Sequence, residues 1–96
     1  MTAFMPVNKL RDTELVIAFS HPQSAYKTHI LIVPKREIAS FADLRPEDFP
    51  IVHEIVRVAQ ELVNELGLGE KGYRLIVNGG AYQDVAQLHY HLISEA

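Results

Sequence analysis

The sequence predicts an α+β fold in which an antiparallel sheet packs against one long helix. Short runs of β-branched and aromatic residues, bounded by turn-forming residues, recur along the chain. Between them, residues 48–66 have helical periodicity. The last two predicted strands are separated by only a short loop, which favours antiparallel pairing.

Composition limits the class of protein. A chain of 96 residues is long enough for one domain, and we expect a single domain over residues 1–96. The net charge of −3 argues against a broad nucleic-acid-binding surface, and no window approaches the ~18 apolar residues that span a bilayer. The start, MTAFMPVNKLRD, lacks a signal-peptide pattern, and cysteine is absent. We therefore expect a cytoplasmic protein that binds neither nucleic acid nor membrane.

Two strands are predicted in the first third of the chain. ELVIAF (residues 14–19) is β-rich, and the turn-rich loop SHPQSAYKT follows it. HILIVPK (residues 29–35) is the second strand, which Pro34 ends because proline cannot donate to the ladder. Residues 36–44 fit either a short strand or a turn.

Residues 48–66 place their apolar side chains within an arc of about 160° at ~100° per residue. Pro46 and Pro50 fit near the helix start, where the missing N–H has no helical partner, and Gly67 fits a C-terminal cap. An arc this wide can face a sheet and still leave an edge for a second helix. We therefore expect a homodimer formed through this helix.

The last part of the chain predicts two more strands. YRLIVN (residues 73–78) and QLHYHLI (residues 87–93) flank the glycine-containing loop GGAYQDVA. Asn-Gly and Gly-Gly pairs are hairpin signals, but such a turn can also present backbone N–H groups to an anion. The pattern leaves both interpretations open.

The terminal strand carries a polar row. Gln87, His89 and His91 share one face, with about 6–7 Å between successive Cα atoms. Such side chains can surround a phosphate, and a neutral imidazole is a competent nucleophile. The same row fits an ordinary solvated face of a sheet. It also fits a metal site completed by His29 or His21, although we assign no metal.

Taken together, these segments resemble the histidine-triad (HIT) family, especially its small nucleoside-phosphoramidase branch. LVIAF and THILIVPK are similar to that family's first strand pair, and LGLGEKGYRLIVNGG is similar to its helix end, glycine turn and central strand. QDVAQLHYHLI resembles its signature segment. The resemblance spans residues 14–94. It implies an antiparallel sheet of about five strands with one long helix packed on it, commonly paired as a homodimer through that helix.

The resemblance also implies roles for individual residues. His89 matches the middle histidine, which attacks the α-phosphorus and becomes nucleotidylated. His91 matches the third histidine, which contacts the phosphate and assists the leaving group, and His29 matches a histidine that lines the same site. Asn78 and Gln83 match polar residues around the phosphate.

Three positions depart from the family pattern. Gln87 stands where the first histidine is expected, and a carboxamide can donate a hydrogen bond but cannot relay a proton. Asp84 replaces a serine near the scissile bond, where a carboxylate repels phosphate. His21 replaces an aspartate that holds the ribose hydroxyls. We assign Gln87 to the catalytic group, and Asp84 and His21 to nucleotide binding.

The resemblance therefore implies a nucleotide hydrolase or nucleotidyl transferase. It would act at the α-phosphate of a nucleoside phosphoramidate or dinucleotide through a nucleotidylated histidine, without a metal or other cofactor. Gln87 and Asp84 motivate an alternative, a catalytically weakened nucleotide- or phosphate-binding module of the same fold.

Overall fold

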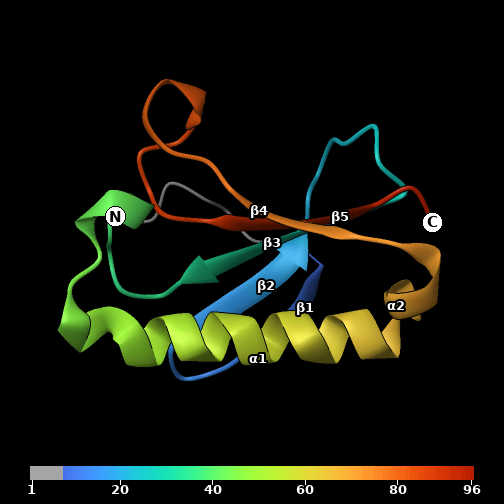
Figure 1. Ribbon diagram of the computed structural model, residues 1–96, viewed down its shortest axis with the longest axis horizontal. Coiled ribbons are helices and arrows are strands. Elements are labelled where there is room, and N and C mark those ends of the chain that lie inside the picture. Colours follow the sequence, from blue (N-terminus) through green and yellow to red (C-terminus); the bar gives the residue numbers. More distant parts are fainter. Residues whose placement is uncertain (1–7) are drawn as a thin grey trace.

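The computed structural model describes residues 8–96, which contain a five-stranded antiparallel sheet and one long helix (Figure 1). The strands are β1 Lys9–Asp12, β2 Val16–Ser20, β3 Thr28–Pro34, β4 Arg74–Val77 and β5 Tyr90–Ser94. Their order in the sheet is β1-β2-β3-β5-β4, and every neighbouring pair is antiparallel. This arrangement confirms the predicted α+β fold.

The early elements lie close to their predicted positions. β2 and β3 overlap the strands predicted over residues 14–19 and 29–35, and β3 ends at Pro34. β1 has no counterpart among the strands predicted from the pattern, since KLRD contains a single apolar residue. Residues 36–44 form a loop with a 3₁₀ turn, Phe41–Asp43, which agrees with the turn interpretation and not with a strand.

The terminal strand begins later than predicted. β5 starts at Tyr90, so Gln87 and His89 precede the strand. The connection from β4 is not a short hairpin loop, because it covers residues 78–89 and contains a 3₁₀ turn, Gly80–Tyr82. The reason is a long-range hydrogen bond. The backbone N–H of Leu88 donates to the carbonyl of Ile38 at 2.7 Å, so this segment is bonded to the loop after β3 and not to a strand.

The long helix α1, Phe49–Glu65, lies along one side of the sheet (Figure 1). It buries one face against the sheet residues Val16, Ala18, Ile30, Ile32 and Leu92, using Ile51, Ile55, Val58, Ala59 and Leu62. Burial of each large aliphatic side chain contributes roughly 1.5–3 kcal/mol. Neither α1 nor any other helix within residues 8–96 is long and apolar enough to cross a bilayer.

The opposite face of the sheet carries a smaller apolar cluster, Phe19, Leu31 and Val33. The β2–β3 and β4–β5 connections extend on this side, away from α1 (Figure 1). The polar residues predicted for the site belong to these connections and to the strands beside them.

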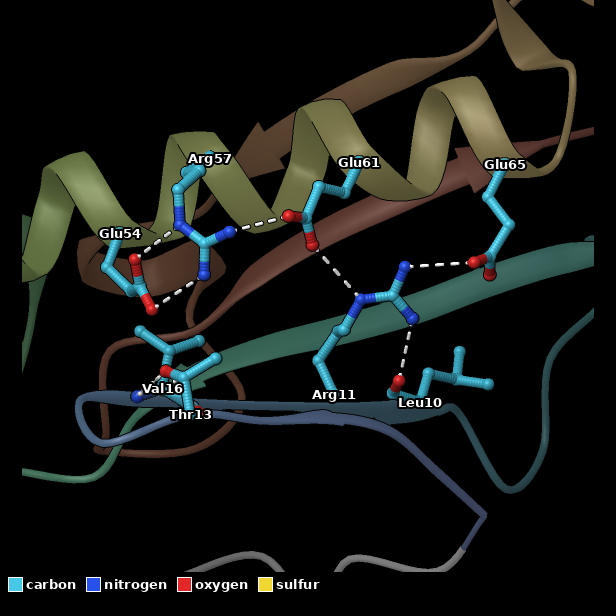
Figure 2. A network of polar contacts seen from close by, with 8 residues as sticks. All are labelled: Leu10, Arg11, Thr13, Val16, Glu54, Arg57, Glu61 and Glu65. Carbon is cyan, nitrogen blue, oxygen red and sulfur yellow. Dashed lines mark hydrogen bonds and ion pairs between the residues drawn. The ribbon is translucent and has the colours of Figure 1, made fainter.

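A charged network ties the edge strand β1 to α1 (Figure 2). The Arg11 guanidinium contacts Glu61 at 3.2 Å and Glu65 at 3.0 Å. On the helix itself, Arg57 pairs with both Glu54 and Glu61. Such exposed pairs contribute little individually, about 0–1 kcal/mol, but together they attach a strand that has few apolar residues of its own.

The residue that ends α1 allows a direct test of the fold. Gly67 has a φ of +67°, and within residues 8–96 no atom beyond its two chain neighbours lies within 4 Å of the position that a Cβ would take. Gly67→Ala therefore adds backbone strain without a clash, and we expect it to lower the free energy of unfolding by about 1 kcal/mol. Urea denaturation measures this loss.

Gly69→Ala is the matched control. Gly69 lies in the short helix α2, Leu68–Lys71, in equally open surroundings and without a left-handed φ. Alanine there is expected to be neutral or to stabilise by up to ~1 kcal/mol. Equal losses in the two variants would contradict the role assigned to Gly67.

Candidate functional site

The pairing of β3 with β5 brings His29 and His91 together. His29 lies opposite Ile93, and His91 lies opposite Leu31, so the two histidines are diagonal neighbours on one face of the sheet. Their rings face away from α1, because the alternating residues, such as Ile30, belong to the core under the helix. His29 Nε2 and His91 Nδ1 are 2.9 Å apart, a hydrogen bond.

His89 lies beside His91, with ring centroids 4.8 Å apart. Its Nδ1 is 2.7 Å from the backbone carbonyl oxygen of Gln87. Because a carbonyl oxygen only accepts, Nδ1 carries a proton, and in the neutral form of the ring the lone pair is on Nε2. The residue is only 6% exposed.

The β2–β3 loop, residues 21–27, encloses the other side of His29. The hydroxyl of Ser24 is 2.7 Å from His29 Nδ1. His21 stacks on the His29 ring with centroids 4.4 Å apart, and Tyr26 meets it edge-on at 5.7 Å. His21 accepts the backbone N–H of Gln23 at its own Nδ1. The four histidines therefore form a continuous row.

Ser24 and Tyr26 contact His29, and the sequence interpretation did not include them among the candidate residues. The signal available was their place in the polar loop SHPQSAYKT directly before His29. Small polar residues in such loops are also common in ordinary turns, so the pattern alone could not distinguish them.

Burial keeps the central histidines neutral. Burial and the neighbouring His21 and His91 lower the pKa of His29 to about 4. The pKa of His91 is also lowered, by burial first and then by His89 and His21, while the carboxylate of Asp84 acts in the opposite direction. At neutral pH the hydrogen bond between His29 and His91 therefore joins two uncharged rings.

The remaining predicted residues surround this row in different ways. Gln87 is 5% exposed and Asp84 is exposed, with its charge acting on His91. Gln83 donates its side-chain N–H to the carbonyl of Ala39 at 2.8 Å, which anchors the β4–β5 connection. Asn78 is half-buried directly after β4.

These positions argue against two of the alternative interpretations, the ordinary solvated face of a sheet and the metal site. The ordinary solvated face does not fit Gln87 and His89, which are 5% and 6% exposed. For a metal site, three ligands must converge on one point, and within residues 8–96 no group of three or more histidine or carboxylate side chains does so. His29 and His91 instead direct their nitrogens at each other.

Comparisons with known proteins agree on one family. The model of the HIT domain family matches residues 4–96. An uncharacterized HIT-like protein of Helicobacter pylori is 34% identical over 92 residues, which cover 94% of this chain and 86% of that protein. The purine nucleoside phosphoramidase of Escherichia coli is 32% identical over 91 residues, covering 93% and 76% respectively.

A solved structure shows the same fold. The HIT family hydrolase from Legionella pneumophila superposes with a TM-score of 0.89 at 31% identity, covering 96% of this chain and 84% of that one.

The low pKa of His29 predicts a loss of stability in acid. Because its pKa of about 4 lies below the usual 6.5, the unfolded chain binds a proton more readily between these values. The free energy of unfolding is therefore retained above pH 6.5 and falls as the pH decreases toward 4. His29 accounts for about 1–2 kcal/mol of this fall, after allowance for its partial exposure. Urea denaturation across this range measures the slope.

His29→Asn should reduce the slope, because asparagine does not titrate. His53→Asn, at an exposed position of α1, should keep it. An unchanged slope in His29→Asn would show that the histidine is not held neutral by the fold.

Proposed function

Because the chain belongs to the HIT domain family, we propose that it is a nucleotide hydrolase or nucleotidyl transferase acting at the α-phosphate of a nucleoside phosphoramidate or dinucleotide. The E. coli relative is named a purine nucleoside phosphoramidase, which supports the phosphorus–nitrogen bond as the one cleaved. The observation that carries the proposal is the hydrogen bond between His89 and the carbonyl of Gln87.

That hydrogen bond supports His89 as the nucleophile. With its proton fixed on Nδ1, the neutral ring directs a lone pair from Nε2. Nε2 attacks the α-phosphorus, a phosphorus–nitrogen bond to the ring forms, and the bond to the leaving group breaks. The electron pair of the broken bond goes to the leaving nitrogen or oxygen, and water then releases the nucleoside monophosphate from His89.

His91 is suited to act on the phosphate or the leaving group. Its Nε2 is buried and has no hydrogen-bond partner within residues 8–96, while its Nδ1 is engaged by His29. When Nε2 carries the ring proton, this buried N–H without a partner is strongly favoured to donate to an incoming anion. We assign His91 to the phosphoryl oxygens or to the leaving atom, with Gln87 and His29 supporting it.

The alternative is a nucleotide- or phosphate-binding module of the same fold with weakened turnover. Its support is the carboxylate of Asp84, whose charge acts on His91 and opposes a bound phosphate. The replacement of the first histidine by Gln87 also removes a group that could carry a proton. Binding of Asn78, Gln83 and His21 to the nucleotide would be common to both functions.

We further propose that the chain forms a homodimer through α1 and β4. Within residues 8–96, β4 pairs only with β5, so its other edge is open. Beside it lies a groove of about 430 Å³ whose lining includes Val56, Tyr73 and Leu75, which are 45%, 49% and 40% exposed. A second copy related by a two-fold axis offers the same strand edge and the same apolar residues.

A cytoplasmic location completes the proposal. The chain has no cysteine and therefore needs no oxidising compartment. We propose neither nucleic acid nor membrane as a partner, because the net charge is −3.

The function is tested by turnover and by intact mass. We expect wild type to release monophosphate from adenosine 5′-phosphoramidate and to form a histidine-linked adenylate. His89→Ala should lose the adduct and at least 10³-fold in turnover, because the nucleophile is removed. His53→Ala, which alters an exposed histidine outside the site, should retain both.

The outcomes distinguish the two functions. Nucleotide binding by wild type without adduct or released monophosphate would favour the binding module. Turnover that survives in His89→Ala would remove His89 as the nucleophile.

The dimer is tested by light scattering after gel filtration. We expect wild type to have about twice the mass of the 10.8 kDa chain. Val56→Glu places a charge in the groove and should yield monomer, whereas His53→Glu places the same charge on α1 outside the groove and should remain dimeric. A monomeric wild type would refute the dimer.

A further inference from the structure

Ser24 stands at the solvent end of a hydrogen-bonded row that reaches a buried atom. Its hydroxyl is 2.7 Å from His29 Nδ1, and His29 Nε2 is 2.9 Å from His91 Nδ1. Ser24 is exposed, His29 and His91 are half-buried, and Nε2 of His91 is fully buried. The row therefore connects solvent to the nitrogen that lacks a partner within residues 8–96.

Each neutral histidine in the row carries a single N–H. If the Ser24 hydroxyl donates to His29 Nδ1, the proton of His29 is on Nε2 and donates to His91, whose own proton is then on Nε2. The backbone N–H of Tyr26 donates to Ser24 Oγ at 3.1 Å, which occupies a lone pair and leaves the hydroxyl proton for His29. The state of one exposed hydroxyl thus determines whether His91 presents a donor or an acceptor.

The His29 ring is held in the orientation that the row requires. His21 covers one face of the ring with an interplanar angle of 20°, and Tyr26 meets it at 80°. Rotation of the ring would break both hydrogen bonds and both ring contacts.

We infer that Ser24 is a positioning residue that sets the tautomers of His29 and His91, so that His91 Nε2–H protonates the leaving nitrogen of a phosphoramidate. This inference rests on the proposed function. It also implies a preference among substrates, because an amine leaves well only when it is protonated, whereas a nitrophenolate leaves without a proton.

The number of protons is conserved over the two half-reactions, because the first takes one from solvent and the second returns one. In the first, His89 Nε2 attacks, the phosphorus–nitrogen bond breaks, and the leaving nitrogen takes the proton of His91 Nε2. His91 Nδ1 takes the proton of His29 Nε2, His29 Nδ1 takes that of Ser24, and Ser24 takes one from solvent. In the second, water attacks the nucleotidylated His89, and its proton returns to solvent by the same row in reverse.

The experiment compares two leaving groups on the same nucleotide. Adenosine 5′-phosphoramidate and the p-nitrophenyl ester of adenosine monophosphate are assayed with wild type and Ser24→Ala. We expect kcat/KM for the phosphoramidate to fall about three- to tenfold, which is the effect of one lost hydrogen bond, and kcat/KM for the ester to change less than twofold. Ser24→Thr keeps the hydroxyl and should restore the phosphoramidate activity.

A spectroscopic measurement tests the row independently of turnover. In wild type, the ¹⁵N chemical shifts of His29 should show a bare Nδ1 and a protonated Nε2, and in Ser24→Ala they should move toward a mixture of tautomers. Gln23→Ala, which keeps the backbone N–H that contacts His21, is the loop control and should change neither activity nor shifts.

Two results would overturn the inference. Equal losses with both substrates would indicate a general structural effect, and unchanged ¹⁵N shifts in Ser24→Ala would show that the hydroxyl does not set the tautomer. If wild type turns over neither substrate, the proposed function fails, while the ¹⁵N shifts still decide whether Ser24 sets the tautomer.

Discussion

The register in which β3 pairs with β5 is the constraint on which the rest of the site depends. It sets Ile30 opposite Leu92 on the core face, and Leu31 opposite His91 on the other face. A slip of one residue would turn the histidines toward α1 and expose the aliphatic side chains. The free energy gained by burying apolar surface under α1 therefore also stabilises the geometry of the histidines, although none of them contributes to that core.

The same face gives the histidines their electrostatic character. His29 and His91 lose hydration in this row of rings, and each lies beside other histidines that would repel its protonated form. Both effects lower the pKa of each ring. Neutral rings can exchange a proton between donor and acceptor nitrogens, whereas two imidazolium ions in contact would repel each other. The consequence is that acid, which protonates these rings, destabilises the folded chain.

His89 is positioned by contacts between loops and not by strand pairing, because it lies before β5. Its segment is attached to residues 38 and 39 by the backbone bond from Leu88 to Ile38 and the side-chain bond from Gln83 to Ala39. The loop that receives these bonds is itself attached to the start of α1 by the ion pair of Arg36 with the buried Asp48. The proposed nucleophile thus depends on contacts between loops, and its neighbour His91 depends on the sheet.

The sequence by itself determined the elements whose cause is local. The apolar arc of residues 48–66 predicted α1, Pro34 marked the end of β3, and Gly67 ends the helix in the left-handed conformation expected of it. The polar pattern of the last segment, with the family resemblance, also identified His29, His89 and His91 as one group. Tertiary structure alone decided where β5 begins, that Gln87 and His89 are buried, and that Ser24 contacts His29. The first two features depend on partners far along the chain, as in the bond from Leu88 to Ile38, which no local pattern encodes. Ser24 lies only five residues before His29, but its contact depends on the conformation of the loop between them, which small polar turn residues leave open.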